Sequence, residues 1–196
     1  MPLFTIIFTV IISVIYILDA FIFVPNGVKR FTKEHLLVGD KSGYIMQALK
    51  LSHEKIVHGQ IWRLFTASLL HVSLLHIITN AAALLIIGYA VETELGGIKI
   101  ALCFIVSTIV SGLTMAFIYK FDDGEGASPG IYGLFAVYFL LAIKNKNIIF
   151  SAAPWLLMVL AGIFFAVGFF TDRASRREHI SGFIGGIIIG APLIWF

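Results

Sequence analysis

The sequence predicts an all-α protein that crosses a lipid bilayer several times. Hydrophobic residues make up 59% of its 196 residues and charged residues only 13%, whereas about 25% of a soluble domain is charged. The mean hydropathy is +0.98. The apolar residues gather in runs long enough for membrane-spanning helices. These features exclude an ordinary soluble protein, and the length predicts one helical bundle in which residues 1–196 form a single domain.

Six apolar segments are expected to cross the membrane. They cover residues 3–24, 64–91, 100–119, 128–143, 148–171 and 180–196. The fourth is short, since residues 128–143 make a helix about 24 Å long at about 1.5 Å per residue, against a hydrocarbon core about 30 Å thick. The first residue of this helix is therefore expected below the membrane surface, where a polar group is costly and often functional.

The connections between the segments differ in length. Residues 25–63 form a long polar loop with many apolar residues, and we expect it to be structured at the membrane interface. The other connections are short and make neighbouring spans antiparallel. Residues 1–24 lack a basic n-region and a small-residue cleavage site, so they are interpreted as a retained span. The single cysteine, Cys103, excludes a disulfide within the chain.

The second segment carries polar side chains inside an apolar run: His71, Ser73, His76, Thr79 and Asn80. His76 and Asn80 are four residues apart, so they share one face of a helix. Burying a polar group in a membrane is costly unless the group is paired, which favours a functional face. Hydrogen bonding between helices is the alternative use of the same residues.

The sixth segment opens with His179, which heads a stripe of glycines: Gly182, Gly186 and Gly190. A stripe of small residues lets another helix approach closely, and packing alone explains these glycines. It does not explain a titratable side chain at the head of the stripe. His179 is therefore expected to face the helix that the glycines admit.

Ser128 begins the fourth segment in a glycine-rich turn. A serine in this position is often only a helix N-cap, and Pro129 suits the first helical position. Three glycines are expected to clear side chains from around the hydroxyl, and they are Gly126, Gly130 and Gly133. Tyr132 lies one helical turn further along the same face. This setting favours a reactive hydroxyl over a cap.

These groups suit acyl transfer. Ser128 can act as a nucleophile and His179 as its general base. His76 and Asn80 can donate hydrogen bonds to a developing oxyanion, as can the backbone N–H of Ser128 at a helix N-terminus.

A third, acidic member of the catalytic set is not evident. Glu178 adjoins His179, and adjacent positions on a helix point in different directions. Asp19 lies in another segment. The set is therefore interpreted as a dyad whose imidazole is oriented by packing, with Tyr132 as the candidate partner.

Over about residues 62–190 the chain resembles the rhomboid intramembrane serine proteases. The matching motifs occur in the family's order: Trp62-Arg63 in the long loop, His71-x4-His76-x3-Asn80 and Gly88-x3-Glu92 in the second segment, Gly126-Ala-Ser128 with Tyr132-Gly133-Leu134, and His179-x2-Gly182-x3-Gly186 in the last. The resemblance implies a six-helix rhomboid bundle whose short fourth helix carries the nucleophile.

The resemblance also implies a role for each matching residue. Ser128 would be the nucleophile and His179 its base, with His76 and Asn80 in the oxyanion hole and Tyr132 packed on the imidazole. His71, Trp62 and Arg63 would hold the long loop against the bundle, and Glu92 would stabilise the opposite end. Pro129 departs from the family pattern, which has glycine after the nucleophile, and its missing N–H removes one backbone donor.

The resemblance implies a protease that needs no metal or cofactor and binds no nucleic acid. Its partners would be transmembrane protein substrates and the lipid bilayer. Its location would be the plasma membrane of a prokaryote, with the site open to the extracytoplasmic side. The charge pattern disagrees, because 11 of the 14 Lys and Arg residues fall on the Ser128 side, which the positive-inside rule would place in the cytoplasm.

Two other functions compete with proteolysis. The first is a non-catalytic rhomboid-like protein that binds membrane proteins without cutting them, and Pro129 is its only support. The second is a small transporter, which is disfavoured because the sequence has no internal repeat and no paired charges within a span.

Overall fold

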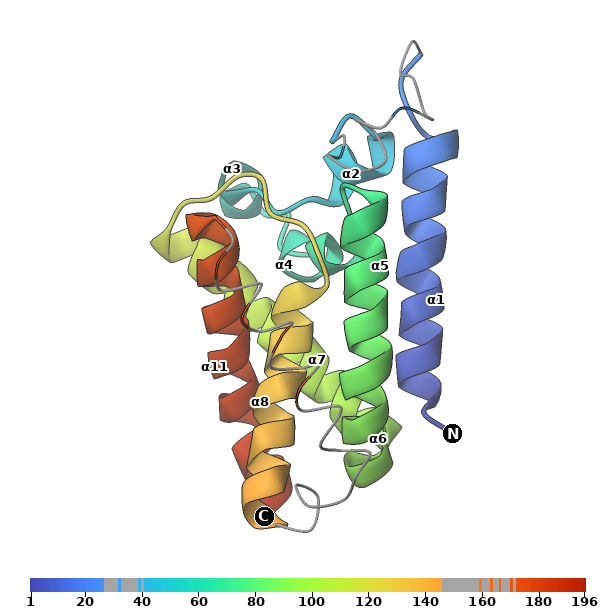
Figure 1. Cartoon of the computed structure of the whole chain (residues 1–196). Coiled ribbons are helices and arrows are strands. Elements are labelled where there is room, and N and C mark those ends of the chain that lie inside the picture. The colour runs from blue at the N-terminus through green and yellow to red at the C-terminus, as the bar shows by residue number, and fades with distance from the viewer. Residues whose placement is uncertain are drawn as a thin grey trace.

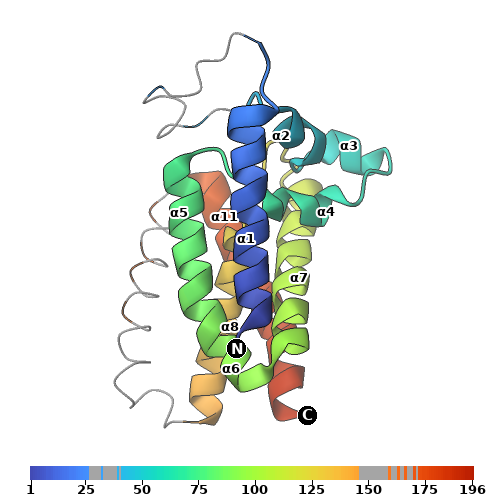
Figure 2. The ribbon, with the colours of Figure 1, turned by 90° about the vertical axis from the view of Figure 1, so that its right-hand side faces the viewer.

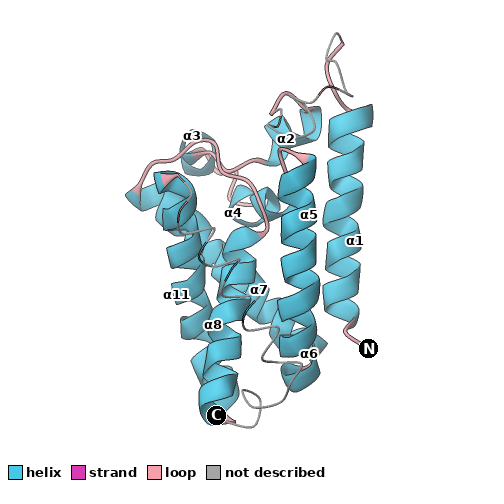
Figure 3. Ribbon diagram, viewed as in Figure 1, coloured by secondary structure: helices cyan, strands magenta, loops and turns pink. Residues whose placement is uncertain are grey.

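The computed structural model describes residues 1–26, 32, 39, 41–145, 159, 163, 166, 170 and 172–196. Within these ranges the regular structure is helical, apart from one isolated bridge between Leu51 and Gly124 (Figures 1 and 3). The predicted span at residues 148–171 lies almost wholly outside the described residues.

Among the described residues, four helices are long and apolar enough to cross a membrane. They are Leu3–Ile22, made of α1 (Leu3–Ile17) and a π-helical turn (Leu18–Ile22); Leu74–Leu95, made of α5 (Leu74–Ala83), a π-helical turn (Leu84–Gly88) and α6 (Tyr89–Leu95); Gly97–Ile118, made of α7 (Gly97–Leu113) and a π-helical turn (Thr114–Ile118); and α11 (Arg173–Trp195). A shorter apolar helix, α8, runs from Ser128 to Lys144.

The second span differs from the prediction at both ends. It begins at Leu74 and not at residue 64, because residues 63–69 form a separate short helix, α4 (Arg63–Thr66), and a 3₁₀ turn (Ala67–Leu69). The Ser73 hydroxyl then caps the new helix by accepting the His76 N–H at 3.2 Å. The span ends at Leu95 and not at residue 91. The next residue, Gly96, adopts a φ of +82° and ends the helix.

The last span begins earlier than predicted. Asp172 caps α11 by accepting the N–H groups of Ala174 and Ser175 at 2.8 and 3.1 Å, so the helix starts in the polar segment at Arg173 and not at residue 180. His179 therefore lies within the second turn of α11 and does not open it. The first and third spans differ from the predicted bounds by no more than three residues at either end.

The helix that carries Ser128 lies in the middle of the bundle. Figures 1 and 2 show α11, α7 and α5 around α8, with α1 outside α5 and α7. Every residue from Ser128 to Tyr138 is buried, so this stretch of α8 has no exposed face. A helix that is apolar all round belongs in such a central position.

Glycines set the close packing of α8. A Cβ at Gly182 would collide with the Pro129 carbonyl, and a Cβ at Gly186 would collide with the Gly133 backbone. The two helices thus meet backbone to backbone, as a stripe of small residues in a membrane protein allows. This contact brings the N-terminal halves of α8 and α11 together.

Three short helices lie at the Ser128 end of the bundle, and both chain termini lie toward the other end (Figure 1). The short helices are α2 (Tyr44–Leu49), α3 (His53–Val57) and α4. The loop before α8 is tied to them, since Leu51 N–H donates to the Gly124 carbonyl and His53 N–H to the Phe121 carbonyl, at 2.9 and 3.1 Å. The long loop is therefore structured where it is described.

The opposite end is fixed by Glu92 of α6. Its carboxylate accepts the N–H groups of Phe4 and Thr5, each at 2.9 Å, and the Thr5 hydroxyl at 2.7 Å. These N–H groups belong to the first turn of α1, where a helix has no internal acceptors. A negative charge is favourable at that position, so Glu92 anchors the first span to the second.

We expect Glu92→Ala to lower the free energy of unfolding by about 2–4 kcal/mol, because it leaves two backbone donors of α1 unpaired in a buried place. Glu92→Gln should cost less, since the amide retains one acceptor oxygen. The measurement is the thermal midpoint in detergent. Glu94→Gln, at the same end of the bundle, is the matched control and should change little. An unchanged midpoint in Glu92→Ala would contradict this anchoring role.

Candidate active site

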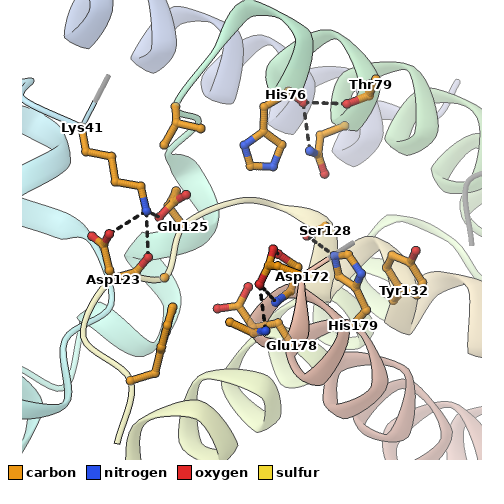
Figure 4. Close-up of a pocket in the computed structure, with 16 residues that line it drawn as sticks. Lys41, His76, Thr79, Asp123, Glu125, Ser128, Tyr132, Asp172, Glu178 and His179 are labelled. Carbon is orange, nitrogen blue, oxygen red and sulfur yellow. Dashed lines mark hydrogen bonds and ion pairs between the residues drawn. The ribbon is translucent and has the colours of Figure 1, made fainter. Parts of the chain in front are cut away.

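The hydroxyl of Ser128 and the imidazole of His179 meet across the contact between α8 and α11. The Ser128 Oγ lies 3.0 Å from the His179 Nε2, and both residues are buried (Figure 4). Ser128 is the first residue of α8, and Ala127 occupies the cap position. The N-cap alternative for Ser128 is therefore wrong, because its hydroxyl bonds to a side chain of another helix.

The imidazole of His179 is held by an aromatic ring. Tyr132 stacks on it with ring centroids 4.2 Å apart and planes 7° from parallel. Asp19 is committed elsewhere, since its carboxylate accepts the N–H groups of Ile45 and Met46 at the start of α2. Ser128 and His179 thus form a hydrogen-bonded pair whose imidazole stacks on Tyr132.

His76 and Asn80 line the same cavity as Ser128 and His179. The Asn80 Nδ2 donates one hydrogen bond to the His76 carbonyl at 2.9 Å. An amide has a second N–H, which remains for a ligand in the cavity. The two residues thus lie on the cavity side of α5, across from the Ser128–His179 pair.

The predicted glycines fall into two groups. Gly126 has a φ of +121°, and a Cβ there would lie 3.0 Å from the His76 Cε1 and 3.8 Å from the Ser128 Oγ. This glycine does clear space beside the hydroxyl. Gly130 and Gly133 do not, because a Cβ on them would meet Phe104 and Ser107 of α7. These two glycines serve the packing of α8 against α7.

The residues expected to hold the long loop also differ from one another. Arg63 is buried and donates to the Gln60 Oε1 and to the Lys50 carbonyl, each at 2.7 Å. His71 is buried and packs edge-to-face with His76, with ring centroids 4.9 Å apart. Trp62 is half exposed, so its side chain does not hold the loop by burial. An exposed indole suits the membrane interface instead.

A network of ion pairs, which the sequence reasoning missed, fixes the loop that leads into Ser128. The Lys41 Nζ lies 2.8 Å from both Asp123 and Glu125 (Figure 4). The Lys50 Nζ lies 2.9 Å from Asp123. Burial acts against ionisation of Asp123, but the hydrogen bonds from both lysines hold its pKa below the ordinary value. Burial raises the pKa of Glu125 despite its bond to Lys41. The signal was three acidic residues in the short loop before Ser128, opposite a lysine-rich loop.

One open cavity of about 470 Å³ lies at the Ser128 end of the bundle. Its lining includes Lys41, His76, Asn80, Ser128, Tyr132, Glu178 and His179. A cavity of this volume is large enough for a short peptide segment, and Ser128 is one of its lining residues. The Ser128 hydroxyl is therefore reachable by an extended chain.

Comparison with known proteins finds relatives of this chain. A family model described as the rhomboid domain matches residues 58–196. RHOMBOID-like protein 2 of Arabidopsis thaliana is 28% identical over 165 residues, which cover 83% of this chain and 52% of that protein. The rhomboid protease GluP of Bacillus subtilis is 27% identical over 186 residues, which cover 95% of this chain and 34% of that protein.

RHOMBOID-like protein 1 of Arabidopsis thaliana is 29% identical over 162 residues, which cover 81% of this chain and 41% of that protein. The chain thus spans about half of the length of these relatives or less. Because the rhomboid-domain match extends over more than half of the chain, this integral membrane protein belongs to the rhomboid family.

Proposed function

We propose that this chain is a serine-type endopeptidase that cuts peptide bonds of other membrane proteins within the bilayer. The observation that carries the proposal is the 3.0 Å contact between the Ser128 Oγ and the His179 Nε2 in an open cavity. A nucleophile within hydrogen-bond reach of a base is the arrangement that activates a serine hydroxyl. The relative GluP carries the name rhomboid protease.

The proposed reaction has two halves. The Ser128 Oγ attacks the scissile carbonyl carbon while its proton passes to the His179 Nε2, and the carbonyl oxygen becomes an oxyanion. The tetrahedral intermediate collapses as the imidazolium gives the proton to the leaving amine. A water molecule, deprotonated by the same imidazole, then attacks the acyl carbon, and the bond to the Ser128 Oγ breaks as the imidazolium returns the proton to that oxygen, which releases the carboxylic acid product. Stacking on Tyr132 keeps the imidazole in place through both halves.

Three donors are proposed for the oxyanion. They are the His76 side chain, the second N–H of the Asn80 amide and the backbone N–H of Ser128. The last points out of the N-terminus of α8, where the helix dipole favours negative charge. Pro129 has no N–H to donate. His76 and Asn80 of α5 therefore contribute a larger share of the oxyanion stabilisation than they would if position 129 were glycine.

The proposed substrates are transmembrane helices of other proteins. A helix hides its carbonyls in internal hydrogen bonds, so the segment at the scissile bond must unwind before Ser128 can reach it. Segments with helix-breaking or small residues unwind at the lowest cost. The proposed setting is a bundle of six spans, with residues 148–171 as the fifth, in the plasma membrane of a prokaryote.

A fluorophosphonate probe tests the proposal, because it labels only an activated serine. The purified protein should be labelled in detergent, and Ser128→Ala should abolish the label. Ser175→Ala, which changes another serine of the cavity lining, is the matched control and should still label. No labelling of the native protein would favour the alternative, a rhomboid-like module that binds membrane proteins without cutting them.

The orientation in the membrane is proposed from the family, with the Ser128 end outside and the termini in the cytoplasm. The charge count argues against it, but several cations at the Ser128 end are already engaged. Lys41 and Lys50 are paired with Asp123 and Glu125, and Arg63 is buried. The free positive charge at this end is therefore smaller than the sequence suggests.

Cysteine labelling decides the orientation. We expect His58→Cys and Arg173→Cys to react with an impermeant maleimide added to intact cells, and Asn145→Cys to react only after lysis. All three positions are exposed, and the native Cys103 is buried and gives no background. The reverse pattern would show that the basic residues set the topology.

A further inference from the structure

The active-site cavity has an acidic part beside the catalytic pair. Four carboxylate residues line it, namely Asp123, Glu125, Asp172 and Glu178. Lys41 is the one lysine or arginine among the described lining residues. In the view of Figure 4, Glu178 and Asp172 are drawn between two sets of side chains. One set is Lys41 with its partners Asp123 and Glu125, and the other is the Ser128–His179 pair. The cavity therefore carries a negative formal charge when its carboxyl groups are ionised.

Three of the four carboxylates have partners within the protein. Asp123 is paired with Lys41 and Lys50, and Glu125 is paired with Lys41. Asp172 accepts two backbone N–H groups and the Ser175 hydroxyl at the start of α11. The position of each of these carboxylates is explained by the fold.

Glu178 is the exception. Its backbone carbonyl accepts the hydroxyls of Ser111 and Ser181, each at 3.0 Å, but within the described part of the chain its carboxylate has no hydrogen bond or ion pair. The carboxylate lies against the loop before Ser128, because a Cβ at Gly124 would be 2.7 Å from its Oε1. A partly buried carboxyl group without a partner costs free energy, and a ligand that supplies a partner would recover it.

Glu178 also has a fixed relation to the catalytic base. It is the residue before His179 on α11, and consecutive positions on a helix point about 100° apart. Both side chains nevertheless line one cavity. The same turn of helix thus presents the base and an unpaired carboxyl group to whatever occupies the cavity.

We propose that Glu178 is a specificity-determining residue that selects transmembrane substrates with a lysine or arginine close to the scissile bond. This inference rests on the proposed function. A substrate cation would supply the missing partner through a charge-assisted hydrogen bond. An acidic side chain there would meet a like charge, which disfavours the wrong substrate. Long basic side chains are compatible with the end of a membrane span, because their stems lie along apolar surface while the charge reaches polar groups.

The test compares cleavage of three versions of one model transmembrane segment by the purified chain in proteoliposomes. The versions carry Lys, Gln or Glu at a single position within three residues of the scissile bond. We expect kcat/KM to be about tenfold higher for the Lys version than for the Gln version, as one charge-assisted hydrogen bond would give, and lowest for the Glu version. Glu178→Gln should bring the Lys-to-Gln ratio below about two.

The Lys-to-Gln ratio of kcat/KM is taken within each variant, so that any general loss of activity in that variant cancels. Glu94→Gln, which removes a carboxylate at the other end of the bundle, should keep the tenfold ratio. Glu178→Asp should restore part of the preference that Glu178→Gln loses, because it keeps the charge. A Lys-to-Gln ratio near one for the native chain, with the substrate substitution placed in turn at each position within three residues of the scissile bond, would overturn the proposal. A preference for the Lys version that survives Glu178→Gln would overturn it as well.

A binding measurement separates this inference from the proposed function. The Ser128→Ala chain is titrated with the fluorescent Lys, Gln and Glu segments in detergent. Tighter binding of the Lys segment, lost in Ser128→Ala/Glu178→Gln, would support the acidic site even if no cleavage were found. Equal binding of all three segments, together with cleavage that depends on Ser128, would overturn the specificity proposal and leave the protease proposal standing.

Discussion

Replacing either Ser128 or His179 by alanine is expected to lower kcat by about 10⁴-fold or more, and the double variant is expected to be no slower than either single variant. Each change removes one half of a nucleophile–base unit whose atoms lie 3.0 Å apart. Once the nucleophile is absent, the base has no proton to accept, so the second change costs nothing further. The measurement is single-turnover cleavage of a transmembrane segment in proteoliposomes.

Stability separates loss of chemistry from loss of fold. Ser128→Ala removes one hydroxyl and should leave the thermal midpoint nearly unchanged. His179→Ala also removes the stack on Tyr132, so a loss of about 0.5–1.5 kcal/mol is expected. His58→Ala, at an exposed position on the α3 side, controls for the loss of an imidazole. A double variant that is much slower than both single variants would mean that the two residues act separately.

The sequence predicts that Ser128, Tyr132 and His179 lie together, because a polar residue in an apolar span is costly unless it has a partner or a function. The structure stacks Tyr132 on His179 at a centroid distance of 4.2 Å and places Ser128 within 3.0 Å of the same imidazole. The resemblance to rhomboid proteases supplied the roles, and the family match supports the membership. The roles themselves remain proposals for the experiments above.

Helix limits were harder to predict, and the reason is physical. The charge-free run from residue 64 reads as one span, but Ser73 caps a new helix and divides the run. The polar start of α11 reads as a loop, but Asp172 caps it and extends the helix by two turns. In both places a single capping side chain sets where the helix begins, and the hydropathy pattern contains no information on capping.

The long-range contacts of the loop residues could not be predicted from the sequence. Nothing in the local pattern around Asp19 indicates that it caps α2, or that Lys41 reaches Asp123 and Glu125. Such pairs depend on how the long loop folds back over the bundle. The same limit applies to Gly130, whose neighbours in sequence suggest a role beside the hydroxyl, although its neighbour in space is Phe104.

The second large effect is expected at Gly126, where alanine should lower kcat by about 10²-fold or more. Its φ of +121° is a backbone conformation that residues other than glycine rarely adopt. The substitution therefore costs about 1–3 kcal/mol of backbone strain. The added methyl group would also lie 3.0 Å from the His76 ring. Displacing His76 would remove one proposed oxyanion donor, and such a loss lowers kcat by about 10²–10³-fold.

Gly59 provides the matched control for this prediction. It has a φ of +96° and no atom within 4 Å of an added Cβ, so Gly59→Ala should show the strain in stability but keep its activity. Gly126→Ala made in a His76→Ala background should cost far less activity than in the native chain, because the donor that it displaces is already gone. Equal losses in both backgrounds would show that the methyl group acts on Ser128 and not on His76. Inactivation by Gly59→Ala as well would mean that general strain, and not the His76 contact, controls the rate.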